Sequence, residues 1–441
     1  MKIISKKGIF FLCLILIIPS TLGQIPIPHN TGESDYFDII SKGNLQKYND
    51  ITVLHVNGSH YEMGYQHGWY LREMVQQNLR AFRLFSELSF EELLEIWYQM
   101  EPFVPQQYID EIQGIADGAN VSFEDVVAAY MDIVWGDRGC FGFAAWGPAT
   151  NTGDMIHTRS FDLPFNVMDP ESGRYVHENH VLIIRHPTDG IPSVAASAAG
   201  SMHGGGGINA EGIAIGQQVC WSNDQTYTGM PAMFRTQMAL DYADSIDKAI
   251  DFLTSNSTLG WNFVVSDSKI PIAYAVESTG NKSYVGTYND SIEATSPFWQ
   301  MDHIVRRTNF FIYPDIAQTQ RHRYDPSGFG GLINFILTGE FFFVIWRAYK
   351  VVSNDLQDQW GYLTCNSSIS LMQQSYRGDT DLLLKIIIFL AEGTSFTRAW
   401  NQWTACYDTG EYAVCFASHD DIAYFNQIHY FNLEQLFNGP F

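Results

Sequence analysis

The stretch GDRGCFGFAAWGPATNTGDMIHTRSFDLPF, residues 136–165, decides how this chain is organised. Cys140 opens an apolar, aromatic run with the character of a β-strand, and a second such run carries Arg159 and ends at Asp162. The turn-forming residues 148–153 between the runs predict two strands joined by a short polar loop, which brings the start of the first strand close to the end of the second. We therefore expect a thiol, a permanent cation and a carboxylate to lie together.

These residue types suit catalysis by a cysteine nucleophile, because a nearby cation lowers the pKa of a thiol. A cut between Gly139 and Cys140 would give Cys140 a free α-amino group, whose ordinary pKa of roughly 7.7–8.0 allows it to accept the thiol proton near neutral pH. Gly139 has no side chain to hinder attack on its carbonyl. Asp162 can orient the new amine, while Arg159 can hold Asp162 and stabilise the thiolate or a substrate carbonyl. A structural salt bridge is the alternative for an Arg-x-x-Asp pair alone.

The spacing GC-x18-R-x-x-D resembles that of the N-terminal-nucleophile (Ntn) amidohydrolases, which cut themselves just before a Cys and use its new amino group. The phrase HTRSFDLPF (157–165) is similar to the motif around the catalytic Arg and Asp of acid ceramidase and choloylglycine hydrolase relatives. The phrases GSHYEMGYQHG (58–68) and DEIQGIADGA (110–119) most resemble the isopenicillin N acyltransferase family. Further phrases continue the likeness in the same order, at 204–216, 231–253, 262–277 and, as a weaker echo, 394–416.

Hydrophobic periodicity predicts the secondary structure around this stretch. The ranges with helical spacing are 61–85, 108–119, 123–134 and 231–253. The ranges with strand character are 180–185, 208–219, 261–277 and a hairpin over 404–416 with its turn at 408–410. Helices, strands, a helix and strands again fit two sheets between helical layers. The family resemblance implies the same α+β fold, a four-layer αββα sandwich of the Ntn hydrolase type with a helical N-terminal pro-segment.

The resemblance also implies an oxyanion hole, whose donors stabilise the charge that develops on the substrate oxygen. The families place an Asn in a Thr-Asn phrase after the strands that end near Glu277. The phrase EATSPFW (293–299) puts Ser296 where that Asn is expected, and Gln218 lies near a second family Asn. We assign Gln218 and Ser296 as the oxyanion candidates. Ser296 has the shorter reach of a hydroxyl, so slow turnover or a different donor is an open alternative.

Three parts of the chain are predicted. Residues 1–23 have the basic start, apolar core and small residues of a signal peptide, 24–139 form a helical N-terminal segment, and 140–441 form the catalytic segment. The apolar core is too short to favour a permanent transmembrane anchor. Six Asn-x-Ser/Thr sequons predict glycosylation on a secreted or lysosomal protein. They begin at Asn57, Asn120, Asn256, Asn281, Asn289 and Asn366.

Composition excludes several partners. The formal charge of −23 argues against nucleic acid and anionic membrane surfaces, which need basic patches. Five cysteines follow the signal peptide, and an odd count in an oxidising compartment predicts one free thiol and two disulfides, with buried free thiols as the alternative. No Cys or His cluster has metal-ligand spacing, so we predict neither a metal nor a cofactor.

Residues outside the central motif raise two further questions. Residues 303–395 fit the family pattern least, and their aromatic stretch EFFFVIW (340–346) predicts a buried helix, with an apolar wall for an acyl chain as the alternative. Glu62 and His67 are assigned structural roles, because residues of this kind on a helix face are more often structural than catalytic. His157 and His203 are assigned structural or pocket-lining roles, because the mechanism does not require them.

Together these features predict an autoprocessing cysteine amidohydrolase that cleaves linear amide bonds of small N-acyl substrates. It would be made as a precursor and mature into two non-covalently held pieces, 24–139 and 140–441. One alternative is an acyltransferase with the same mechanism, in which an amine rather than water takes the acyl group. Another is a secreted glycoprotein without catalysis, in which Cys140 is disulfide-bonded.

Overall fold

A computed structural model describes residues 33–132, 139–321, 333, 342–390 and 397–439. The predicted signal peptide lies outside these residues. The chain falls into two compact units, Met1–Asp38 and Ile39–Phe441. Of the first unit the structure describes only the beginning of helix α1 (Glu33–Ser41). The two sheets and the candidate site belong to the second unit.

The larger sheet has nine strands in the order β1-β2-β5-β6-β7-β8-β9-β10-β11. Its strands are β1 (Asn44–Tyr48), β2 (Ile51–Gly58), β5 (His180–Pro187), β6 (Ser193–Ala198), β7 (Gly206–Asn209), β8 (Ile213–Val219), β9 (Trp261–Asp267), β10 (Ile272–Ser278) and β11 (Ser283–Gly286). Among the described strands, β2 and β5 are the only neighbours that pair in parallel. The segment 24–139 was predicted to be helical, and this is wrong for β1 and β2, which extend the sheet through the β2–β5 pair.

The smaller sheet has six antiparallel strands in the order β12-β3-β4-β13-β14-β15. Its strands are β3 (Gly139–Ala145), β4 (Ile156–Pro164), β12 (Ile304–Arg307), β13 (Thr397–Cys406), β14 (Glu411–Phe416) and β15 (His429–Asn432). The predicted hairpin is confirmed as β3 and β4, with Cys140 opposite Phe161 and Gly139 opposite Asp162. The bond between Gly139 and Cys140 therefore lies at the start of a central strand.

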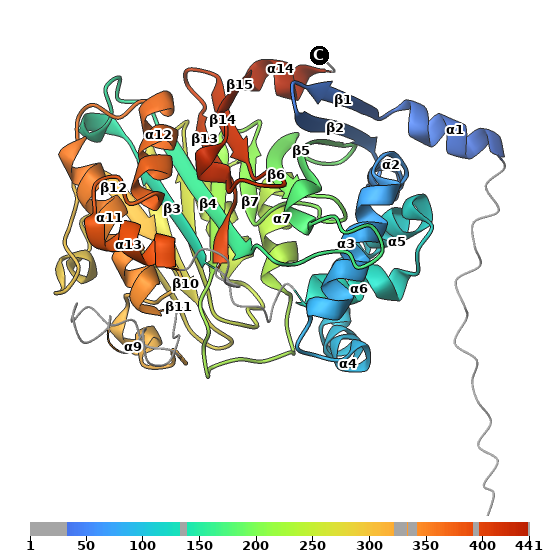
Figure 1. The fold of residues 1–441 in the computed structure, drawn as a ribbon, viewed down its shortest axis with the longest axis horizontal. Helices are drawn as coiled ribbons and strands as arrows, with labels where there is room; N and C mark the ends of the chain where they lie inside the picture. Colours follow the sequence, from blue (N-terminus) through green and yellow to red (C-terminus); the bar gives the residue numbers. More distant parts are fainter. Residues whose placement is uncertain (1–32, 133–138, 322–332, 334–341, 391–396, 440–441) are drawn as a thin grey trace, which may run out of the picture. The chain divides into compact units, whose positions relative to one another are not determined.

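The two sheets pack face to face because both inner faces are apolar. Leu182 and Ile184 of β5 belong to the same buried cluster as Trp403 and Val414 of the smaller sheet. The outer face of the larger sheet packs against the N-terminal helices, α7 (Ala232–Tyr242) and α8 (Ile246–Thr254). The outer face of the smaller sheet packs against α11 (Phe342–Asp358) and α12 (Cys365–Tyr376) (Figure 1). The predicted αββα sandwich is confirmed.

Glycines determine how two N-terminal helices meet, α2 (His60–Tyr70) and α5 (Gln106–Ala119). A Cβ added at Gly64 would lie 2.1 Å from the Glu111 carbonyl oxygen, and one added at Gly114 would lie 2.3 Å from the Tyr61 carbonyl oxygen. Only residues without a side chain permit this backbone contact. The family-like phrases 58–68 and 110–119 thus form one close helix pair.

Two predicted helices are each divided in the structure. The range 61–85 is interrupted at Leu71 between α2 and α3 (Arg72–Phe85). The range 231–253 is interrupted between α7 and α8, where the Asn209 amide donates to the carbonyls of Leu240 (3.0 Å) and Ala243 (2.8 Å) at the end of α7. A side chain from a sheet turn therefore ends the helix, which local periodicity does not reveal. The other helices are α4 (Phe90–Met100), α6 (Phe123–Asp132), α9 (Pro314–Ala317), α13 (Leu382–Leu390) and α14 (Leu433–Asn438).

The cysteines that follow the predicted signal peptide are all buried thiols, so the prediction of two disulfides is wrong for this structure. Cys220 packs in a cluster with Phe311, whereas Cys365, Cys406 and Cys415 lie in the cluster under the smaller sheet. In the described part of the chain, no helix combines the length and apolar character needed to cross a bilayer.

Candidate active site

A cavity lies at the open end of the β3–β4 hairpin. Three of the predicted residues, Gly139, Cys140 and Asp162, line it together. They meet because antiparallel pairing places the first residues of β3 beside the last residues of β4. The hairpin thus places a buried thiol, the peptide bond that precedes it and a carboxyl group in one cavity.

Arg159 lies beside the cysteine sulfur. Its Nη2 is 3.7 Å from Cys140 Sγ, and its guanidinium donates to the carbonyls of Gly204 (2.7 Å) and Gln217 (2.9 and 3.2 Å). A Cβ at Gly205 would lie 2.4 Å from Nη2, so a glycine is needed at this position to admit the side chain. Burial lowers the pKa of Arg159 from its usual high value. The site therefore places a fully buried cation against the thiol.

The predicted pairing of Arg159 with Asp162 is wrong. The ion pairs of the described residues do not include one between them, and Arg159 is held by main-chain carbonyls instead. Asp162 is three positions after Arg159 along β4, so their side chains leave opposite faces of the strand. Arg159 can therefore act on the sulfur without neutralising the carboxyl group.

Asp162 sits in a polar group on the outer face of the hairpin. It accepts hydrogen bonds from Ser160 Oγ (2.5 Å) and from the Tyr376 hydroxyl. Burial raises the pKa of Asp162 to about 7, although both hydroxyls and the Arg159 charge oppose this rise. Because Asp162 pairs with Gly139 across the hairpin, a carboxyl group with a pKa near neutral lies beside the Gly139–Cys140 peptide bond.

Sequence reasoning missed the loop that follows β12. Cys140 N–H donates to Asn309 Oδ1 at 2.6 Å, and Thr308 Oγ1 donates to the Cys140 carbonyl at 2.7 Å. Asn309 Nδ2 donates to the Val219 carbonyl at 2.8 Å. The Asn262 amide supports the loop by donating to the carbonyls of Thr308 (2.9 Å) and the residue after Asn309 (2.7 Å). Thr308 and Asn309 both line the cavity and hold the backbone of Cys140 on two sides.

The two oxyanion candidates lie elsewhere. Ser296 is exposed and is not among the residues that line the cavity. The Gln218 amide donates to the Gly216 carbonyl at 3.1 Å and lies against Gly142, inside the sandwich. The expected Thr-Asn phrase is present as Thr308–Asn309, beyond the segment 293–299 in which it was sought. The dipeptide itself was the signal, and the geometry does not support Ser296 or Gln218 as donors in this cavity.

The four side chains assigned structural roles have buried or capping partners. Glu62 completes the cap of α2, and His67 Nε2 accepts from the Gly200 N–H at 2.8 Å. His157 contacts Ser266 Oγ at 2.8 Å, and His203 Nδ1 accepts from the N–H of Gly205 at 2.9 Å. Burial lowers the pKa of His67, His157 and His203 to about 4, 3 and 4, respectively. None of the four lines the Cys140 cavity.

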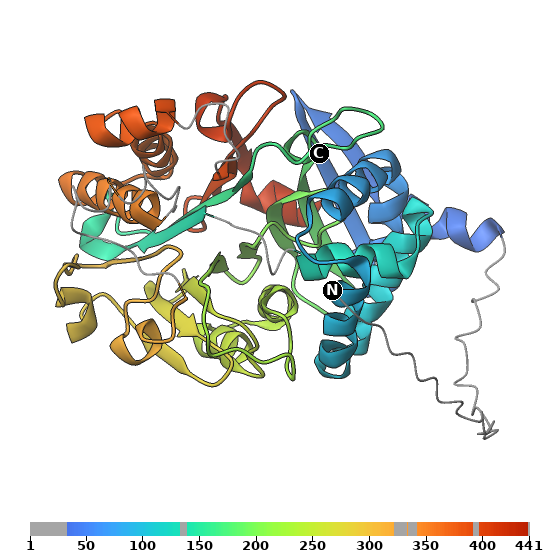
Figure 2. The same cartoon turned by 60° about the horizontal axis from the view of Figure 1, so that its bottom comes forward.

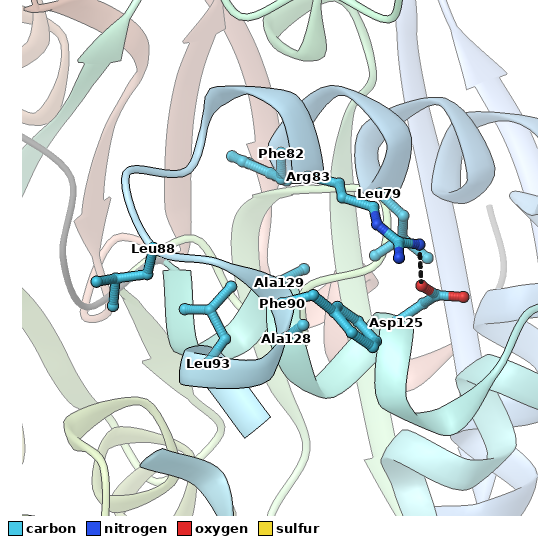
Figure 3. A pocket seen from close by; sticks show the side chains of 9 residues that line it. All are labelled: Leu79, Phe82, Arg83, Leu88, Phe90, Leu93, Asp125, Ala128 and Ala129. Atoms are coloured by element: carbon cyan, nitrogen blue, oxygen red, sulfur yellow. Dashed lines mark hydrogen bonds and ion pairs between the residues drawn. The ribbon is translucent and has the colours of Figure 1, made fainter. Parts of the chain in front are cut away.

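Two further pockets lie towards the N-terminal helices. One reaches the Arg159 side of the hairpin and includes Phe161, Gly205 and Gln217. The other is a smaller apolar pocket between α3, α4 and α6, with the Arg83–Asp125 ion pair (3.1 Å) at its edge (Figure 3). Of the predicted catalytic residues Cys140, Arg159 and Asp162, none lines the smaller pocket.

Comparisons with known proteins found chains that are similar to this one over part of its length. An uncharacterized protein of Archaeoglobus fulgidus is 28% identical over 314 residues, covering 60% of this chain and 51% of the relative. Protein dcd1B of Dictyostelium discoideum is 24% identical over 236 residues, covering 46% and 45%. The chain thus spans about half the length of these curated relatives. A solved structure of a Caenorhabditis elegans N-acylethanolamine-hydrolyzing acid amidase ortholog aligns with TM-score 0.38 and 11% identity, covering 60% of this chain and 92% of that one.

The match to a known protein family covers the central part of the chain. It begins just after strand β4 and includes the loop that carries Asn309. This part contains the glycine run beside Arg159, the β8–β9 strands and the Thr308–Asn309 pair. Residues 168–329 match the acyl-coenzyme A:6-aminopenicillanic acid acyl-transferase family, which is the enzyme family that the sequence motifs predicted.

Proposed function

We propose that this chain is an autoprocessing cysteine amidohydrolase of the Ntn type, which cleaves linear amide bonds of N-acyl substrates. One observation carries the proposal. The Cys140 sulfur lies 3.7 Å from the buried Arg159 guanidinium, and the Cys140 nitrogen is held at 2.6 Å by Asn309 in a cavity shared with Gly139 and Asp162.

The first reaction is the cut that exposes the amine. The Cys140 sulfur attacks the Gly139 carbonyl carbon, the carbon–nitrogen bond breaks, and the thiol proton ends on the freed Cys140 nitrogen. Water then opens the resulting thioester, giving a Gly139 carboxyl group and returning a proton to the sulfur. No α-amine exists before this step, so Asp162, with a pKa of about 7, is suited to carry the proton within the cavity.

Substrate turnover would use the same atoms. The freed α-amine accepts the thiol proton, the thiolate attacks the substrate amide carbon, and the amine returns the proton to the leaving nitrogen. Arg159 stabilises the thiolate, while Asp162 and Asn309 Oδ1 orient the ammonium group by accepting its hydrogen bonds. Water then hydrolyses the acyl-enzyme and releases the carboxylic acid.

The proposal is tested by purifying the full chain and examining it on a denaturing gel with N-terminal sequencing. We expect two pieces, one of them beginning with Cys140, and a single uncut chain for Cys140→Ala. Cys415→Ala is the matched control, because it removes another buried thiol and should leave the cut unchanged. A wild-type protein that stays as one chain, or is cut only elsewhere, would refute autoprocessing.

A second candidate is acyl transfer to an amine, which is favoured by the description of the matched family. The acyl-enzyme is the same, and only the acceptor differs. Adding an increasing concentration of a free amine to a reaction with one N-acyl substrate separates the two. A transferase forms the new amide at the expense of the acid, whereas a hydrolase forms the acid at every amine concentration.

We also propose that the protein passes through the secretory pathway with N-linked glycans. The asparagines of all six predicted sequons are exposed, which is compatible with modification. Treating protein from a eukaryotic host with a glycosidase specific for N-linked glycans should increase its mobility on a gel. Unchanged mobility would contradict the glycan part of this proposal.

A further inference from the structure

We infer that helices α11 and α13 form the wall that receives the acyl chain of the substrate, and that they set its preferred length. This inference rests on the proposed function. It concerns a part of the chain, 342–390, that lies outside the family match at 168–329. The preference for one acyl-chain length would therefore come from helices that lie outside the matched region.

The wall follows from which helix faces meet the cavity. Val344, Ile345 and Ala348 of α11 line the same cavity as Cys140, and so do Leu384 and Ile388 of α13. Positions three or four residues apart lie on one face of a helix, so each helix presents an apolar stripe to the nucleophile. A hydrocarbon chain is the ligand that such a surface favours, because burying apolar area is favourable without any directional partner.

The two helices hold each other in place. Val344 and Val351 of α11 pack against Leu384 and the neighbouring Ile387 of α13 in one buried cluster. An ion pair between Arg347 and Asp381 ties the start of α13 to the same helix. The wall is therefore a packed pair of helices rather than a single side chain, and its lining positions can be changed one at a time.

The position of Gly139 decides which half of the substrate uses this wall. In the processing reaction Gly139 supplies the acyl group and Cys140 supplies the leaving nitrogen. Gly139 itself lines the cavity, so the acyl side of the bond that Cys140 attacks lies in this space. The second pocket, beside Arg159, is the competing location for the chain.

The test measures kcat/KM for amides of one chromogenic amine with straight acyl chains of roughly two to sixteen carbons. Ala348→Phe and Ile388→Phe each fill the cavity. The control is Ile386→Phe on the same helix, where the native side chain is 46% exposed and does not line the cavity. Cleavage at Cys140 is recorded on a gel for every variant, which shows that each has folded and matured.

We expect wild-type kcat/KM to rise with chain length, and either cavity variant to lower it about tenfold or more for long chains while short chains stay within about twofold. If the cavity variants change kcat/KM equally for all chain lengths, or do not change it, α11 and α13 do not form the acyl-chain wall. The amidase proposal would still stand. Met233→Phe fills the second pocket. If this variant, but not Ala348→Phe, shows a length-dependent loss of kcat/KM, the acyl chain of the substrate binds in the second pocket, and the inference is equally overturned. Absence of cleavage at Cys140 in wild type would instead refute the proposed function.

Discussion

The most direct electrostatic consequence of the site is that the uncut chain is destabilised by the Asp162 carboxylate. Burial raises the pKa of Asp162 from 3.8 to about 7 in a chain whose Cys140 nitrogen is still an amide. The folded protein therefore binds a proton more tightly than the unfolded chain does. We predict that Asp162→Asn, introduced into the uncut Cys140→Ala protein, increases the free energy of unfolding at neutral and alkaline pH.

The sign follows from proton linkage. Below about pH 4 the Asp162 carboxyl group is protonated in both the folded and the unfolded protein, so it does not affect the free energy of unfolding. As the pH rises from about 4 to about 7, the free energy of unfolding falls, because the carboxyl group ionises in the unfolded chain before it does in the folded protein. Above about pH 7 the loss is constant. The difference between 3.8 and about 7 corresponds to about 4 kcal/mol, which is an upper value for the gain in Asp162→Asn. The hydroxyls of Ser160 and Tyr376 can turn to serve the amide, so little of this gain is lost.

The assay is denaturant unfolding of both uncut proteins at about pH 4 and about pH 8. The gain from Asp162→Asn should be near zero at the lower pH and a few kcal/mol at the higher one. Asp420→Asn is the control, since that carboxylate is 88% exposed and its removal should give the same small effect at both values. Equal free energies of unfolding for the Asp162→Asn and parent proteins at about pH 8 would refute the inference that the buried Asp162 carboxylate destabilises the folded protein.

Three other predictions follow from single contacts. Asn309→Ala should slow cleavage and turnover about 100-fold, measured by gel and by kcat, because it removes the acceptor that positions the Cys140 nitrogen, whereas Ser296→Ala should not; a large effect of Ser296→Ala would restore the assignment made from sequence. Gly114→Ala should lower the free energy of unfolding by about 1–3 kcal/mol in urea, because its Cβ would meet a carbonyl oxygen at 2.3 Å, while the exposed change Gln113→Ala should be nearly neutral. Glu111→Gln should lower the free energy of unfolding by about 3–5 kcal/mol in the same assay, because it leaves the buried guanidinium of Arg185 without the full charge of its partner. A decrease of less than about 1 kcal/mol would contradict that pairing.

The hairpin was predictable because its signals are local. Two apolar runs separated by Pro, Gly and Asn residues predict antiparallel strands, and antiparallel pairing alone brings Cys140 and Asp162 to one end. The strand pairs at 208–219, 261–277 and 404–416 were found for the same reason. In each case the turn residues fix the pairing of neighbours in sequence. The αββα arrangement followed from the order of these elements.

The remainder depended on contacts between residues far apart in the sequence. Asn309 meets the Cys140 nitrogen from a loop 169 residues away, so the Thr-Asn dipeptide was a signal of its place in the site but did not show which backbone group it contacts. Arg159 was assigned to Asp162 because the two are close in sequence, whereas strand geometry separates them and gives the guanidinium to Gly204 and Gln217. β1 and β2 were missed because nearly every residue of β2 is buried. A strand that is covered on both faces shows no alternation of polar and apolar residues.

The structure also explains why a cut before Cys140 need not separate the two pieces. β2 lies before the cut and pairs with β5, which lies after it. The Glu111 carboxylate from the first piece binds the Arg185 guanidinium from the second, with both side chains 2% exposed. The Asn78 amide donates to the Ala199 carbonyl at 2.8 Å across the same boundary. Separating the pieces would expose these groups without partners, so after the proposed cut the fold itself would keep the new terminus of Cys140 beside Asp162 and Asn309.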